Sequence, residues 1–262
     1  MNTERVSNHI ISWLKEYAEK ANVNGFVVGV SGGIDSAVTS MLCAKTGLQT
    51  LCVEMPIHQA ENQVTRARNH IKHLKNEFIN VTSTKVDLTN TFEAFKEANQ
   101  PEENNAKLDL ALANTRARLR MTSLYYLAGL NGLLVAGTGN KIEDFGVGFY
   151  TKYGDGGVDL SPIADLLKSE VYELANHLGV IDSIQNAAPT DGLFGDSRTD
   201  EDQIGASYDE LEWAMKMQNA NKKHQDFSGR ELEVFTIYTR LNTINQHKMN
   251  PIPVCKINIE LK

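Results

Sequence analysis

Apolar residues recur at helical spacing at the start of the chain and then gather into a short continuous run. Val6, Ile10 and Leu14 return every four positions, which predicts an amphipathic helix over residues 3–21. The run at 26–30 is continuous and rich in valine, which is typical of a central parallel strand covered on both faces. The chain therefore opens with a helix followed by a buried strand.

The same alternation of strand and helix continues for most of the chain. Further strands are predicted at 50–55, 78–86 and 133–137, and further helices at 36–47, 64–74, 91–98, 108–130 and 166–178. This order predicts an α/β fold in which helices flank a doubly wound, Rossmann-like parallel sheet, with residues 1–262 forming one domain. Beyond residue 184 the strand pattern fades, and the polar, glycine-containing stretch 191–205 predicts a mobile loop.

Composition narrows the classes of partner. The formal net charge is −7, whereas a nonspecific grip on nucleic acid needs clustered lysine and arginine, so we expect no nucleic-acid partner. No run of about 18 apolar residues occurs, and no membrane segment is expected. Cys43, Cys52 and Cys255 fit neither a zinc site nor a CxxC motif, so Cys43 and Cys52 are expected in the core and the protein in the reducing cytoplasm.

The loop after the first strand is the strongest candidate for chemistry. Its residues are Gly29, Val30, Ser31, Gly32, Gly33, Ile34, Asp35 and Ser36. In open parallel sheets, ligands bind beyond the carboxyl ends of the strands. The two glycines allow close approach of a ligand, and the following helix offers free N–H groups to an anion. The loop therefore predicts a site for phosphate groups.

Other interpretations of this loop compete with phosphate binding. A Walker P-loop is excluded because the loop has no lysine. Gly29 to Gly33 matches the GxSxG pattern of a hydrolase with Ser31 as nucleophile and His247 as a late histidine, but that elbow usually follows several strands and not the first one. A purely structural turn, with Asp35 and Ser36 capping the helix, is the remaining alternative.

The hexapeptide at 31–36, SGGIDS, resembles the pyrophosphate loop of the N-type ATP pyrophosphatases, which include the NAD, GMP and asparagine synthetases. Within that group the chain is similar to the ammonia-dependent NAD synthetases in four further segments. These are NTRARLRM at 114–121, GTGNKIE at 137–143, FYTKYGDGGVD at 149–159 and the late pair His247-Lys248. One departure is Glu54, where these enzymes often have an arginine before the Met/Leu-Pro pair.

The resemblance implies roles for particular residues. ATP binding is implied for residues 29–36 together with Thr138, Lys168 and Thr190; deamido-NAD binding for Arg118, Lys152, Asp159, His247 and Lys248; a Mg²⁺ ion held by Asp35 and Glu143; and catalytic roles for Asp35, Lys168 and Asp155. Two carboxylates facing a phosphate are ordinary ligands for magnesium.

The same resemblance implies a reaction and an assembly. The carboxylate of deamido-NAD would be adenylated by ATP with release of pyrophosphate, and ammonia would then displace AMP to give NAD. The first strand begins about 25 residues into the chain, so no glutaminase domain is expected before it and free ammonia is the expected nitrogen donor. A homodimer is implied, and the 191–205 loop is expected to close over ATP. A tRNA-modifying relative and a noncatalytic adenine-nucleotide-binding module remain alternatives.

Overall fold

A computed structural model of the chain describes residues 1–59, 61–100, 107–190 and 199–261. Its centre is a sheet of four parallel strands in the order β3-β2-β1-β4. The strands are β1 (Gly25–Gly29), β2 (Gln49–Glu54), β3 (Val81–Lys85) and β4 (Leu133–Val135). The chain runs outward from β1 to β2 and β3, and then returns to the other side of β1 with β4. The order therefore reverses at β1, as ligand-binding α/β sheets do.

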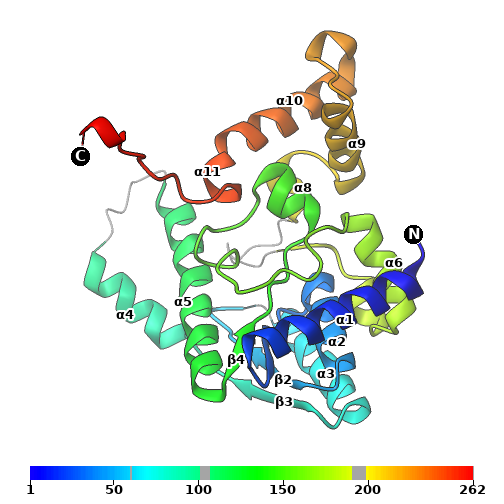
Figure 1. The fold of residues 1–262 in the computed structure, drawn as a ribbon, viewed down its shortest axis with the longest axis vertical. Helices are drawn as coiled ribbons and strands as arrows, with labels where there is room; N and C mark the ends of the chain where they lie inside the picture. Colours follow the sequence, from blue (N-terminus) through cyan, green and yellow to red (C-terminus); the bar gives the residue numbers. More distant parts are fainter. Residues whose placement is uncertain (60, 101–106, 191–198, 262) are drawn as a thin grey trace.

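Helices cover both faces of this sheet, as Figure 1 shows. One face packs against α1 (Thr3–Ala21), α2 (Ile34–Lys45), α3 (Glu61–Glu77), α6 (Lys168–Leu178) and α7 (Asp182–Gln185). The other packs against α4 (Thr89–Asn99) and α5 (Leu108–Asn131). The valine-rich β1 is buried on both faces because alternate side chains enter the two cores. The predicted doubly wound sheet is confirmed.

The last third of the chain is helical and has a hydrophobic cluster of its own. This cluster joins the π-helical turn η1 (Ile142–Val147) to α9 (Tyr208–Asn219) and α10 (Gly229–Ile244). The short elements in this part are α8 (Asp200–Ile204), η2 (His224–Asp226), α11 (Gln246–Met249) and η3 (Ile259–Leu261). The cluster anchors η1, which carries Glu143 of the candidate site.

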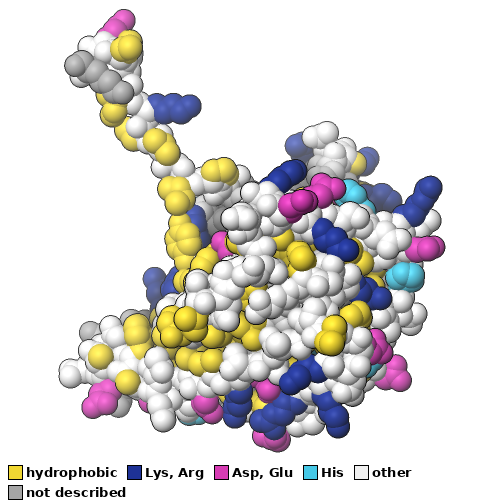
Figure 2. All heavy atoms as spheres, turned by 60° about the horizontal axis from the view of Figure 1, so that its bottom comes forward, with side chains coloured by type: hydrophobic (Ala, Val, Ile, Leu, Met, Phe, Trp, Pro, Cys, Tyr) yellow, Lys and Arg dark blue, Asp and Glu magenta, His cyan; other side chains and the backbone are white. Residues whose placement is uncertain are grey.

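The segment after α11 projects from the body of the protein with apolar side chains along it (Figure 2). Its exposed apolar residues are Ile252, Val254, Ile257, Ile259 and Leu261, and Leu261 is 81% exposed. Exposed apolar residues in such number are unusual on a surface that faces only water.

Two expectations need correction. The strand predicted to reach residue 137 ends at Val135, because Ala136 makes only an isolated bridge to Leu160 before the chain turns away. Part of the loop predicted over 191–205 is helix α8, since the Thr199 hydroxyl caps its first turn by accepting from the N–H of Asp202 at 3.1 Å. Residues 191–198 lie outside the described residues, and the predicted mobility of the loop remains untested.

The expected placement of the first two cysteines is confirmed, since Cys43 and Cys52 are fully buried. Burial also raises the pKa of Cys52 to about 12, which keeps this thiol protonated and inert. In the described parts of the chain, every helix is too short or too polar to cross a bilayer.

Candidate active site

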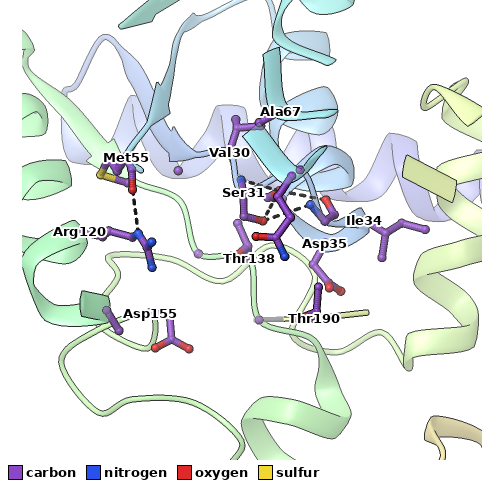
Figure 3. A pocket seen from close by; sticks show the side chains of 18 of the residues that line it. Val30, Ser31, Ile34, Asp35, Met55, Ala67, Arg120, Thr138, Asp155 and Thr190 are labelled. Carbon is purple, nitrogen blue, oxygen red and sulfur yellow. Dashed lines mark hydrogen bonds between the residues drawn. The ribbon is translucent and has the colours of Figure 1, made fainter. Parts of the chain in front are cut away.

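A cavity of about 270 Å³ lies at the carboxyl ends of β1, β2 and β4. Figure 3 shows Met55 and Arg120 on one side of it and Asp35 and Thr190 on the other. Of the residues predicted to bind ATP, all line this cavity: 29–36, Thr138, Lys168 and Thr190. The fold thus brings together side chains that lie more than 150 positions apart in the sequence.

The loop between β1 and α2 is held open by its own serines. The Ser36 hydroxyl donates to the carbonyl of Gly33 at 3.0 Å and accepts from the N–H of Ser31 at 3.2 Å, while the two serine hydroxyls lie 3.1 Å apart. Gly32 has φ of +85°, and a Cβ there would lie 2.6 Å from the carbonyl oxygen of Gln63 in α3. Glycine is therefore required, and the loop presents the N-terminus of α2 to the cavity.

Ser31 is not arranged as a hydrolase nucleophile. A catalytic serine needs a histidine within hydrogen-bond reach, whereas the Ser31 hydroxyl contacts Ser36 and accepts from the N–H of Gly33 at 3.2 Å. His247, the histidine that the hydrolase interpretation requires, bonds instead through Nδ1 with the carbonyl of Ile244 at 3.0 Å. These contacts contradict the hydrolase alternative.

Lys168 lies between the two carboxylates predicted to hold magnesium. Its Nζ donates to Oδ2 of Asp35 at 2.6 Å and to Oε1 of Glu143 at 3.1 Å, and its side chain is 4% exposed. The three residues come from the start of α2, from η1 and from the start of α6. The two carboxylates therefore converge on one point, which a cation already occupies.

Two further residues fix this arrangement. Asn140 donates through Nδ2 to Oδ1 of Asp35 at 3.1 Å, while its own Oδ1 accepts from the N–H groups of Ile142 and Glu143. The Tyr208 hydroxyl donates to Oε1 of Glu143 at 2.6 Å from the other side. Both side chains are buried. Asn140 thus fixes the position of the Asp35 carboxylate, and Tyr208 fixes that of Glu143.

The electrostatics of the centre follow from burial and charge. Burial raises the pKa of Asp35, although Lys168 works in the opposite direction. For Lys168, burial alone would lower the pKa, but the two carboxylates outweigh it and hold the pKa above the ordinary lysine value. The neighbouring Asp144 is buried beside Glu143 and Asp155, and burial followed by these charges raises its pKa to about 8. The site is thus rich in acidic residues, and Lys168 is the cation between its two central carboxylates.

The residues predicted to contact deamido-NAD gather at the loop after η1, next to this cavity. Arg118 on α5 donates through Nη2 to the carbonyl of Lys152 at 3.3 Å, and Nζ of Lys152 donates to the carbonyl of His247. Lys248 reaches the same loop from α11, where its Nζ donates at 2.8 Å to the carbonyls of Gly148 and Tyr150. Four of the five predicted residues therefore form one basic cluster.

Asp159, the fifth of these residues, is engaged elsewhere. Its Oδ2 accepts from the N–H of Val135 at 2.8 Å, and its Oδ1 accepts from the hydroxyl of Tyr125 at 3.0 Å. These bonds tie the end of β4 to α5. In this structure the Asp159 carboxylate accepts hydrogen bonds that hold β4 and α5 together, and its predicted contact with substrate remains untested.

Sequence reasoning missed three residues of the site. Asn140 and Tyr208 carry no motif of their own, and only the fold shows them bonded to the carboxylates. Arg120 lines the cavity and donates to the carbonyl of Met55 at 3.0 Å and to Gln59 at 2.6 Å. A signal for Arg120 was available, because it lies two positions after Arg118 in the same arginine-rich helix.

The comparisons with known proteins match this geometry. Residues 6–251 match the family model for NAD synthase. The chain belongs to the NAD synthase family. It is 39% identical over 234 residues to the NH(3)-dependent NAD(+) synthetase of Finegoldia magna, covering 89% of this chain and 92% of that protein. It is 37% identical to the enzyme of the same name from Carboxydothermus hydrogenoformans, covering 88% of this chain and 92% of that one.

A solved structure provides a further comparison. The NMN synthetase from Francisella tularensis superposes with a TM-score of 0.85 at 30% identity, covering 98% of this chain and 100% of that chain. The predicted fold class and the predicted family are both confirmed. The residue roles that the family resemblance implied are consistent with the geometry but are not tested by it.

Proposed function

We propose that this member of the NAD synthase family is an ammonia-dependent NAD synthetase. It would convert deamido-NAD, ATP and ammonia into NAD, AMP and pyrophosphate. The observation that carries the proposal is the single cavity in which the loop 29–36, the Asp35 and Glu143 carboxylates and Lys168 meet beside the basic cluster of Arg118, Lys152 and Lys248. The first group suits a triphosphate, and the second suits an anionic dinucleotide.

The ATP phosphates fit the N-terminus of α2. The first N–H groups of a helix and the positive end of its dipole favour an anion, and at α2 the serine hydroxyls add donors. The acid's carboxylate oxygen would attack the α-phosphorus while the bond to pyrophosphate breaks. Lys168 would move from the carboxylates to the phosphates and stabilise the negative charge that builds up during this step.

Magnesium fits the carboxylates of Asp35 and Glu143. Mg²⁺ is usually held by one or two carboxylates together with substrate phosphates, and both carboxylates already reach one bound cation, Nζ of Lys168. When bound, the ion would neutralise charge on the pyrophosphate leaving group. Its two protein ligands are held ready by Asn140 and Tyr208.

The second half of the reaction takes place at the loop 151–157. Ammonia would attack the acyl carbon of the adenylate, AMP would leave, and one proton would be released. Asp155 lines the cavity from this loop and accepts from the N–H of Thr151 at 3.0 Å, so its carboxylate is positioned to orient ammonia. Thr138 and Thr190 line the same cavity and would contact ATP.

The proposal is tested by incubating the protein with ATP, Mg²⁺, ammonium and deamido-NAD and following AMP and NAD. We expect one AMP for each NAD, and AMP formation that requires deamido-NAD. Asp35→Asn should abolish adenylation while its circular dichroism stays close to that of the parent. ATP consumption that is independent of deamido-NAD would refute the proposal and would favour another N-type pyrophosphatase, whereas ATP binding without turnover would indicate a noncatalytic nucleotide-binding module.

A second candidate activity is NMN synthesis, in which the acid is nicotinate mononucleotide. The observation that favours it is the close superposition on the Francisella tularensis NMN synthetase. Both acids carry the same carboxylate and differ only in the second nucleotide. The ratio of kcat/KM for the two acids decides between them, and a higher value for the mononucleotide would replace NAD synthesis as the main activity.

We also propose that the protein acts as a homodimer in the cytoplasm. The apolar side chains of the projecting segment, residues 251–261, support this because a second copy could cover them. Light scattering after size-exclusion chromatography should give twice the mass of one chain. Deletion of residues 251–261 should lower the measured mass toward that of a single chain. A wholly monomeric protein at micromolar concentration would contradict the proposal.

A further inference from the structure

Arg66 is a cation of α3 that lies against the loop between β1 and α2. Its Nε donates to the carbonyl of Gly32 at 3.3 Å, and Arg66 lines the same cavity as the loop. This turn of α3 is close to the loop backbone, since a Cβ on Gly32 would lie 2.6 Å from the carbonyl oxygen of Gln63 and 3.1 Å from the nitrogen of Ala67. Helix α3 therefore brings a guanidinium group to the edge of the loop.

The far end of the Arg66 side chain has no protein partner. Its Nη1 and Nη2 make no hydrogen bond or ion pair in the part of the chain that the structure describes, and neither atom is buried. Arg68, two positions later on α3, differs because its guanidinium lies 3.4 Å from Glu54 and 3.6 Å from Glu61. A guanidinium group presents five N–H donors, and Nε supplies only one of them. The remaining donors of Arg66 are available to an anion.

The lysine of the site is not available in the same way. Nζ of Lys168 donates to Asp35 at 2.6 Å and to Glu143 at 3.1 Å, so it can reach a phosphate only by leaving these carboxylates. Arg66 has no carboxylate to leave among the described residues. The planar fork of a guanidinium group also matches two phosphate oxygens at once. Arg66 is therefore suited to bind phosphate as soon as a nucleotide enters.

The direction of the reaction indicates which phosphates lie near Arg66. In an in-line displacement the attacking and leaving oxygens lie on opposite sides of the phosphorus. The acid would approach the α-phosphorus from the loop 151–157, which carries Asp155. Figure 3 shows Ala67, the residue after Arg66, on the far side of Ser31 from Asp155. The leaving pyrophosphate should therefore lie toward α3.

We infer that Arg66 binds the pyrophosphate portion of ATP through Nη1 and Nη2 while its Nε holds the carbonyl of Gly32. The inference rests on the proposed function only in requiring that the cavity bind ATP with its pyrophosphate away from the acid. It adds a substrate-binding cation from α3 to a loop that has no lysine of its own. It also accounts for the unpaired end of the side chain, because the substrate supplies the partner.

The test compares three probes, ATP, AMP and inorganic pyrophosphate, whose dissociation constants are measured by calorimetry with Mg²⁺ and without the acid substrate. The decisive variant is Arg66→Gln. Glutamine carries an amide nitrogen at the position of the arginine Nε, so the bond to Gly32 can persist while both Nη groups are lost. ATP and pyrophosphate should bind about 10- to 100-fold more weakly, the range expected for hydrogen bonds to a charged group, and AMP should bind as it does to the parent protein.

Two further variants separate charge from position. Arg66→Lys keeps a cation but loses the donor at the Nε position, and it should retain part of the affinity for pyrophosphate. Arg68→Gln makes the same substitution as the decisive variant two positions along the same helix. Because Arg68 is paired with Glu54 and Glu61, this variant should bind all three probes as the parent protein does.

Three outcomes would overturn the inference. If Arg66→Gln binds ATP and pyrophosphate like the parent protein, Arg66 only holds Gly32 in place. If ATP and AMP weaken equally, the side chain does not act on the pyrophosphate portion. If Arg68→Gln weakens pyrophosphate as much as Arg66→Gln does, the effect is the general charge of α3.

The same measurements distinguish this inference from the proposed function. If the three probes behave as expected but deamido-NAD is not amidated, the proposed function fails and the role of Arg66 stands. If the parent protein amidates deamido-NAD and the Arg66→Gln variant keeps its affinity for pyrophosphate, the proposed function stands and the inference is wrong. Absence of measurable binding of ATP and pyrophosphate to the parent protein would refute both.

Discussion

Lys168→Met tests the central arrangement of the site most directly. The substitution keeps much of the side-chain volume but removes the ammonium group that bonds to Asp35 at 2.6 Å and to Glu143 at 3.1 Å. Removal of one partner from a buried ion pair costs about 3–5 kcal/mol, because the remaining charges are left buried and unpaired. The folded chain should therefore lose stability of this order in the absence of ligands. Because either carboxylate can escape the penalty by taking up a proton, the loss should grow as pH rises.

Magnesium should reverse this loss. In the parent protein Lys168 occupies the point where the carboxylates converge, so Mg²⁺ without ATP should hardly change the free energy of unfolding. In Lys168→Met that point is open to the metal, and at about 100 times its dissociation constant the ion should restore about 2.7 kcal/mol. The measurement is urea unfolding at pH 7.5 with and without Mg²⁺ and without nucleotide.

A surface lysine provides the control. Lys141 pairs with Asp165 at 2.8 Å, but Asp165 is 97% exposed, so Lys141→Met should change stability by less than about 1 kcal/mol and should not respond to Mg²⁺. The reasoning fails if Lys168→Met is as stable as the parent protein, or if Mg²⁺ alone stabilises both proteins equally.

Three other predictions concern different parts of the molecule. Burial, with a contribution from His73, lowers the pKa of His70 from 6.5 to about 4, so the folded state should lose roughly 3 kcal/mol of stability as pH falls between these values. In urea titrations His70→Gln should make the free energy of unfolding less dependent on pH, and an unchanged pH dependence would contradict the role of His70. Tyr208→Phe removes the donor to Glu143 while keeping the ring, so kcat should fall about tenfold with KM for the acid unchanged; a loss of stability alone would make the hydroxyl merely structural. Lys248→Met frees two loop carbonyls, and KM for the acid should rise about tenfold with KM for ATP unaffected; equal changes in both would place Lys248 outside acid binding.

The fold and the phosphate loop could be predicted because local sequence determines them. The valine run of β1 and the periodic apolar residues of α1 gave both elements to within a residue or two. Gly32 is a similar case, because the turn after β1 requires the positive φ of +85° that favours glycine. Predictions of this kind need only the neighbours along the chain.

The remaining features depend on contacts between distant segments. Lys168 was predicted to contact ATP, but its position between two carboxylates depends on the packing of α6 against α2. Helix α8 was not predicted, because its acidic residues resemble those of a polar loop. In the structure the Thr199 cap makes these residues the first turn of a helix. Asn140 and Tyr208 are ordinary residues in the sequence, and only the fold gives them partners.

The bridge between Ala136 and Leu160 has a consequence for how this protein could change over evolutionary time. The chain leaves the sheet edge at Gly137 and returns beside it at Leu160, and the N–H of Gly137 donates to the carbonyl of Leu160 at 2.8 Å. The segment between Gly137 and Leu160 is joined at its two ends by this hydrogen bond, so the ends stay about one strand spacing apart whatever residues lie between them. Doubling the length of such a loop costs only about 0.6 kcal/mol in closure entropy. Insertions in the part of this segment near Lys152 would therefore change the acid that is accepted, while Glu143, β1 and the ATP loop are inherited unchanged.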